Sequence, residues 1–104
     1  MNAANDFIHS IEEFSRETQS ELIQDRINFL RTAILDNERV LRYYQTAMIA
    51  MNNEILRIGR NNRGAQPLID ALNYFTHEYD EWSETNRDNR NEIEEIENYR
   101  DILL

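Results

Sequence analysis

Two long stretches of the sequence repeat apolar residues at alternating steps of four and three. The stretch 23–58 holds eleven such positions, of which all but Asn37 are apolar, and 68–103 holds eleven more in the same alternation. This is the heptad spacing by which one face of a helix packs against another helix. The sequence therefore predicts an all-α protein with two long helices, at about 21–60 and 67–104.

The residues between these stretches predict a tight turn. The chain has only two glycines, Gly59 and Gly64, and one proline, Pro67, so it offers few places for a turn. Gly64 suits the end of a turn, and Pro67 suits the first turn of a helix. Because two arms of matching length joined by a short turn form an antiparallel pair, we expect residues 19–104 to form one long, coiled-coil-like helical hairpin.

Residues 1–18 predict a separate short amphipathic helix and a linker. Thr18 and Glu21 have the spacing of a capping box, which marks the start of the following helix. Asn5 is the candidate cap of the short helix, and Ser10 with Glu13 is a competing start. The apolar residues that share one face of the short helix are Phe7, Ile8, Ile11 and Phe14. We therefore expect a three-helix arrangement, completed by oligomerisation if the short helix covers too little of the hairpin.

Folding the hairpin at its turn sets which residues face each other across the seam. In the register that the turn implies, Met51 lies opposite Phe75, and Asn37 lies opposite Asn89. A polar pair in an apolar seam fixes register at some cost in stability, so we interpret the two asparagines as register-setting residues. The run 83–92 contains no apolar side chain. We expect the helix to continue through it, and a break that leaves a short last helix is the alternative.

The first long helix carries a second apolar stripe beside its seam. The residues of this stripe are Phe29, Ala33, Val40, Tyr43, Ala47 and Ala50. An N-terminal helix of about ten residues spans only about 15 Å, so it leaves much of the stripe uncovered. Because uncovered apolar surface of this extent marks a protein contact, we predict that these six residues bind a partner or another copy. The alternative is a monomeric bundle in which the short helix covers the stripe.

The sequence holds no recognisable catalytic or cofactor motif. It has no cysteine, no nucleophile elbow and no phosphate-binding loop, so we predict neither an enzyme nor a bound cofactor. His77 and Glu81 lie one turn apart, but a zinc site needs three or four ligands, and we predict no metal. We predict no small-molecule substrate either, because we interpret one cluster near the turn as core rather than as a pocket. That cluster comprises Tyr44, Met48, Met51, Phe75, Tyr79 and Trp82.

The net charge of −9 is unevenly spread. Residues 61–104 carry eleven acidic side chains against four arginines, whereas residues 21–60 carry five against six. Nucleic-acid binding is not expected, because phosphate contacts need positive charge. The chain is lysine-free, and Arg57, Arg60 and Arg63 gather at the turn. There they either complement the helix dipole or form a docking tip for an acidic partner.

These observations predict a non-enzymatic helical protein that binds protein, as a structural subunit of a larger assembly or as a homo-oligomer. One alternative is an acidic inhibitor, of a viral or DNA-mimic type, that acts through the carboxylates of the last helix. Another is a secretion chaperone or an export substrate. The sequence shows neither a signal peptide nor a membrane-spanning apolar run. We therefore expect a cytoplasmic location, or export without a cleaved signal.

Overall fold

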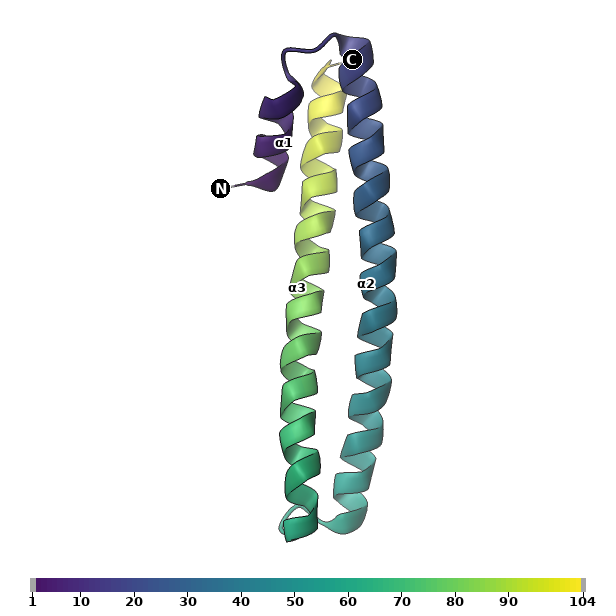
Figure 1. The fold of residues 1–104 in the computed structure, drawn as a ribbon, viewed down its shortest axis with the longest axis vertical. Helices are drawn as coiled ribbons and strands as arrows, with labels where there is room; N and C mark the ends of the chain where they lie inside the picture. The colour runs from purple at the N-terminus through teal and green to yellow at the C-terminus, as the bar shows by residue number, and fades with distance from the viewer. Residues whose placement is uncertain (1, 104) are drawn as a thin grey trace. The chain divides into compact units, whose positions relative to one another are not determined.

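The computed structural model describes residues 2–103, which fold into three α-helices (Figure 1). These are α1 (Ala3–Ile11), α2 (Arg16–Ile58) and α3 (Gln66–Leu103), and a short 3₁₀ helix, η1 (Arg63–Ala65), leads into α3. The predicted all-α class and helical hairpin are confirmed, while the predicted helix end at residue 104 lies outside the described residues. Within the described part of the chain, no helix is both long enough and apolar enough to cross a membrane.

Helix α1 begins where an asparagine side chain caps it. The Asn2 Oδ1 atom accepts hydrogen bonds from the backbone N–H groups of Ala4, at 2.9 Å, and Asn5, at 3.3 Å. Such a cap satisfies donors that have no partner inside the helix, and it lies three residues before the predicted cap, Asn5. Because α1 ends at Ile11, Phe14 falls outside the helix with 52% of its surface exposed.

Helix α2 starts at Arg16, earlier than the predicted start near residue 21. The Ser15 hydroxyl accepts a hydrogen bond from the backbone N–H of Thr18 at 3.2 Å. Ser15 therefore provides the cap that the capping-box pattern assigned to Thr18. Serine and threonine are both good caps, so sequence spacing alone does not choose between these two positions.

One buried side chain ties the link between α1 and α2 to α3. Gln19 is 4% exposed, and its Nε2 atom donates to the backbone oxygens of Glu12, at 3.3 Å, and Phe14, at 2.7 Å. Its Oε1 atom accepts from the hydroxyl of Tyr99 at 2.6 Å. The amide thus satisfies backbone groups that the link cannot satisfy within a helix, and it fixes them relative to α3.

The turn of the hairpin starts with a left-handed glycine. Helix α2 ends at Ile58, and Gly59 follows with a φ of +98°, a conformation that glycine adopts without strain and that commonly ends helices. The Asn62 side chain then accepts the N–H of Gly64 at 2.9 Å, and Ala65 is fully buried. The turn therefore uses both glycines, and the left-handed one is Gly59.

The described residues divide into two compact units, and α2 and α3 contribute to both. The first unit holds the residues up to Leu35 together with those from Asn86 onward, and the second unit holds Asp36–Thr85. The core of the first unit combines α1 with the start of α2 and the end of α3, which is the predicted three-helix arrangement. Its buried apolar residues are Ala4, Ile11, Ile23, Ile27, Leu30, Ile34, Ile93 and Ile96.

The first unit also buries an asparagine. Asn86 is 1% exposed, and its Nδ2 atom donates to the backbone oxygen of Ile34 at 3.2 Å. Its Oδ1 atom is buried and meets no donor among the described residues.

The ribbon of α3 runs unbroken through 83–92 (Figure 1), so the predicted continuity is confirmed. Asn37 and Asn89 are both half-buried and lie in different units, so their register-setting role stays a prediction.

The second unit pairs α2 with α3 in a register that differs from the predicted one. Phe75, which was expected opposite Met51, has its ring centroid 5.3 Å from that of Tyr44, edge to face. The buried Ala65 explains the difference, because the prediction began the seam only at residue 68. Within this unit, an extra buried position at the turn brings Phe75 opposite a part of α2 farther from the turn. A heptad seam tolerates such a shift, since its apolar positions recur along the helix.

Candidate protein-interaction surface

Exposed large apolar side chains are more numerous on α2 than on any other element. Helix α3 carries two of them, Tyr74 and Ile102. Single exposed apolar residues are ordinary on protein surfaces, so what matters is which of them lie together and how firmly they are held. The large apolar side chains of α2 that are more than half exposed are Phe29, Leu35, Tyr43, Ile49 and Leu56.

The predicted interface residues of the first unit are Phe29 and Ala33. Phe29 is 63% exposed, and Ala33 is half-buried. The guanidinium carbon of Arg26 lies 5.3 Å from the centre of the Phe29 ring. A guanidinium over a ring face is a favourable contact, so Phe29 already has one side-chain neighbour. A role for these residues in binding stays a prediction.

The other four predicted interface residues lie together in the second unit. Val40, Tyr43, Ala47 and Ala50, here called the Tyr43 face, follow one another at steps of three and four along α2 and so share one side of the helix. Tyr43 is 65% exposed and Ala50 is exposed, while Val40 and Ala47 are half-buried. The Tyr43 face thus presents one large ring among small side chains, a surface that another helix can approach closely.

The Tyr43 ring rests on other aromatic rings. Its centroid is 5.6 Å from that of Tyr44 and 6.4 Å from that of Phe75, and Tyr74, which is 58% exposed, lies 5.9 Å from Phe75. These separations are those of favourable aromatic pairs. Two exposed rings therefore lean on the same half-buried ring. Their conformations are restricted before anything binds, which lowers the entropic cost of binding.

Charged pairs flank the Tyr43 face at both ends. Toward one end, Asp36 Oδ1 lies 4.0 Å from Arg39 Nη1, and toward the other end Glu54 pairs with Arg57. The hydrogen bond from Arg57 holds the pKa of Glu54 below its ordinary value of 4.5. All four side chains retain substantial solvent exposure, so they remain available to charges on another molecule.

The three arginines near the turn differ in their surroundings. Arg57, Arg60 and Arg63 are all exposed. Arg57 donates to the Glu54 carboxylate through Nε and Nη2, so its charge is partly offset within the helix. Arg60 and Arg63 lie beyond the end of α2, in the turn and in η1. Docking of an acidic partner at this tip stays a prediction.

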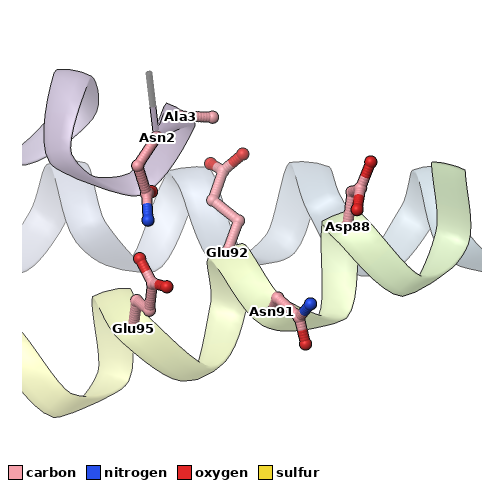
Figure 2. Close-up of a pocket in the computed structure, with 6 residues that line it drawn as sticks. All are labelled: Asn2, Ala3, Asp88, Asn91, Glu92 and Glu95. Carbon is pink, nitrogen blue, oxygen red and sulfur yellow. The ribbon is translucent and has the colours of Figure 1, made fainter. Parts of the chain in front are cut away.

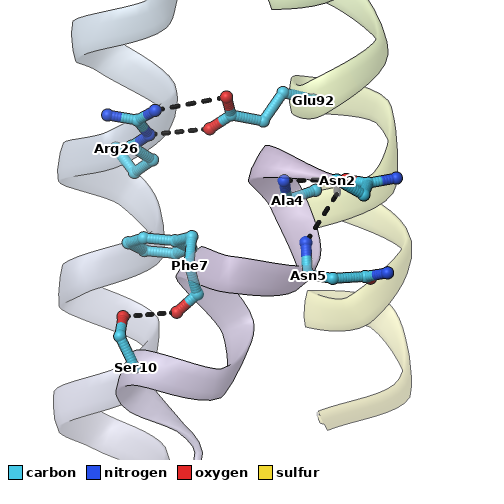
Figure 3. Close-up of polar contacts among 7 residues, drawn as sticks. All are labelled: Asn2, Ala4, Asn5, Phe7, Ser10, Arg26 and Glu92. Carbon is cyan, nitrogen blue, oxygen red and sulfur yellow. Dashed lines mark hydrogen bonds and ion pairs between the residues drawn. The ribbon is translucent and has the colours of Figure 1, made fainter.

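In the first unit, the start of α1 and one side of α3 enclose an acidic hollow (Figure 2). Its one buried carboxylate, Glu92, is 7% exposed and accepts hydrogen bonds from Arg26 Nε, at 2.7 Å, and Arg26 Nη2, at 3.2 Å (Figure 3). This paired geometry is that of a structural ion pair. The residues that line the hollow are Asn2, Ala3, Asp88, Asn91, Glu92 and Glu95.

The histidines form isolated pairs with neighbouring glutamates. His77 Nε2 lies 3.0 Å from Glu81 Oε1, as the spacing indicated, and both side chains are exposed. His9 Nδ1 lies 3.1 Å from Glu12 Oε1, one residue before the Glu13 that helical spacing also allows. Over residues 2–103, no group of three or more His, Cys, Asp or Glu side chains is placed to hold a metal ion.

Sequence reasoning missed two features of these surfaces. It did not single out Tyr74, although an aromatic residue directly before the seam residue Phe75 is a signal for a ring at the edge of the seam. It also assigned no role to Asn86, which falls on the four-three alternation that starts at residue 68. The structure makes Asn86 the most deeply buried asparagine of the described chain.

Comparison with known protein families, curated proteins and solved structures finds no significant match to this chain. Its function is therefore inferred from its own surfaces.

Proposed function

We propose that this chain is a non-enzymatic protein-binding subunit that acts through the Tyr43 face, within a larger assembly or a homo-oligomer. The observation that carries the proposal is an exposed but well-supported tyrosine ring set among small side chains on α2. Apolar surface removed from water is worth about 25 cal/mol per Å², so a partner that covers this face gains free energy. Aromatic side chains of this kind are enriched at the centres of protein interfaces.

Affinity capture from the source cells tests this proposal when it uses two variants that add the same charge. Tyr43→Glu places a carboxylate on the Tyr43 face. Gln45→Glu is the matched control, because Gln45 is exposed on the same helix but two positions away, on another side. Far-ultraviolet circular dichroism checks whether both variants keep the helical content of the wild type.

The proposal expects a bound protein that the wild type and Gln45→Glu retain and that Tyr43→Glu loses. The bound protein can be another chain or a second copy of this one. If the two variants retain the same proteins as the wild type, binding does not use the Tyr43 face and the proposal is wrong.

The exposed carboxylates of α3 support a second candidate, an acidic inhibitor of a basic protein. Salt separates the two candidates, because binding between exposed charges is screened at raised ionic strength whereas binding through apolar contacts is not. A complex that dissociates steeply as salt rises, and that Tyr43→Glu leaves intact, favours the inhibitor. The exposed acidic residues along α3 include Asp80, Glu81, Glu84, Asp88 and Glu94.

A further inference from the structure

We propose that the Tyr43 face binds a second copy of this chain, with the two α2 helices antiparallel about a twofold axis that passes between Thr46 and Ala47. This inference rests on the proposed function and names the partner. A twofold interface uses the same patch on both copies. Residues at equal distances along the helix on either side of the axis therefore face each other across it.

The distribution of charge favours α2 as the surface at which two copies meet. Each copy carries a net charge of −9, so two copies repel one another. Residues 61–104 carry eleven acidic side chains against four arginines, whereas residues 21–60 carry five against six. Most of the excess negative charge therefore belongs to the arm that contains α3. Two copies approach with the least repulsion when their α2 helices face each other.

The charged pairs that flank the Tyr43 face occur in the order that an antiparallel dimer needs. Asp36 and Arg57 are equally distant from the proposed axis, and so are Arg39 and Glu54. Each acid of one copy then meets an arginine of the other copy at both ends of the interface. In a parallel dimer each residue would face its own counterpart, acid against acid and arginine against arginine. The order of charges therefore selects the antiparallel arrangement.

The sizes of the side chains fit the same axis. Tyr43 and Ala50 are equally distant from it, so the exposed ring of one copy lies over the exposed methyl group of the other. Ala47, beside the axis, presents only a methyl group where the two helices come closest, and helix separation depends on the side chains at the contact. The contact from residue 36 to residue 57 is about 33 Å long at 1.5 Å per residue.

Sedimentation equilibrium measures whether the dimer exists. The wild-type chain is expected to sediment at micromolar concentration with twice its monomer mass of 12.5 kDa. Ala47→Glu, which brings two carboxylates together at the axis, is expected to be monomeric, and the matched control Gln45→Glu is expected to remain dimeric. A wild-type chain that is monomeric under these conditions overturns the inference.

Cross-linking measures the position of the axis, because the chain has no cysteine of its own. Ala47→Cys is expected to give covalent dimers with a short bismaleimide, since the two thiols lie close to the axis. Gln45→Cys lies on another side of α2 and is expected to give few. Equal cross-linking of the two variants overturns the proposed axis.

Charge reversal tests the antiparallel order. Asp36→Arg alone and Arg57→Asp alone are each expected to weaken the dimer by about tenfold, because each places like charges opposite one another at both ends. The double variant restores opposite charges, and its dissociation constant is expected to return to within about threefold of the wild-type value. A double variant that is weaker than both single variants overturns the antiparallel pairing.

These outcomes separate this inference from the proposed function. A monomeric chain that captures a different protein through Tyr43 overturns the second copy as partner and leaves the proposed function in place. A monomeric chain whose captured proteins do not depend on Tyr43 overturns both.

Discussion

Replacing Asn86 with leucine is expected to raise the stability of the protein. Leucine has the same number of side-chain heavy atoms as asparagine, with the same branching, so the change replaces two polar atoms with two methyl groups at little cost in packing. The Asn86 side chain makes one hydrogen bond, from Nδ2 to the backbone oxygen of Ile34 at 3.2 Å. Its other polar atom, Oδ1, is buried and meets no donor among the described residues.

The expected gain follows from these two atoms. The hydrogen bond to Ile34 contributes a net of about 1 kcal/mol, whereas the unpaired buried acceptor costs about 1–3 kcal/mol. Burying two methyl groups in place of the amide adds a further favourable contribution of about 1 kcal/mol. Asn86→Leu should therefore raise the free energy of unfolding by about 1–3 kcal/mol, and each 1 kcal/mol corresponds to a rise of roughly 4–8 °C in the unfolding temperature.

Urea unfolding followed by circular dichroism measures this gain, at one fixed protein concentration because a dimer would make stability depend on concentration. Asn91→Leu is the matched control. Asn91 lies on the same helix but is exposed. Asn91→Leu therefore gains the higher helix propensity of leucine without burying the new side chain. If Asn86→Leu is no more stable than Asn91→Leu, the buried amide does not carry the cost assigned to it, and the reasoning fails.

Three further results are expected. Arg26→Ala leaves the Glu92 carboxylate buried without its guanidinium partner and should lower the free energy of unfolding by about 2 kcal/mol, less than for a fully buried pair because Arg26 is one-third exposed; an unchanged urea midpoint contradicts this. Ile55→Ala empties a fully buried position and should cost about 3 kcal/mol in the same measurement. Arg57→Gln should return the lowered pKa of Glu54 toward 4.5 in an NMR titration. Because that pKa is lowered by folding, the contribution of the pair is present above pH 4.5 and is lost as the pH falls through the folded-state value; a pKa that does not change on substitution refutes the assigned cause.

The helices and their pairing were predictable because they depend on patterns that extend over many residues. An apolar seam sustained across 23–58 compels a long helix, and a short turn between two such seams compels an antiparallel pair. The polar run 83–92 did not interrupt α3, because a helix that is anchored on both sides continues through a stretch of poor apolar content.

The register and the caps were less predictable because several residues satisfy the same local rule. Asn86 and Asn89 are both polar seam positions, and only the length of the turn decides how deeply each is buried. That length depends on Ala65, whose small side chain gave little signal that it would be fully buried. Ser15 and Thr18 are likewise both good caps, and the contacts that the link makes through Gln19 decide between them.

The position of the Tyr43 face was predictable, but its exposure and the support of its ring were not. Helical spacing alone places Val40, Tyr43, Ala47 and Ala50 on one side of α2. Whether that side is exposed depends on what covers it. The support of the Tyr43 ring by Phe75 depends on the register, which the sequence did not determine.

The hydrogen bond between Gln19 and Tyr99 joins residues 80 positions apart in the sequence. A ribosome makes α1 and the link before it makes the part of α3 that receives them. Throughout that interval, the start of α2 is present but Ile93 and Ile96 of α3 are not, so the apolar face of α1, with Ile11 at its end, cannot be fully buried. Docking of α1 is therefore a late step in the folding of the newly made chain, and the α1 segment is where a chaperone would have the longest access to an unburied apolar face.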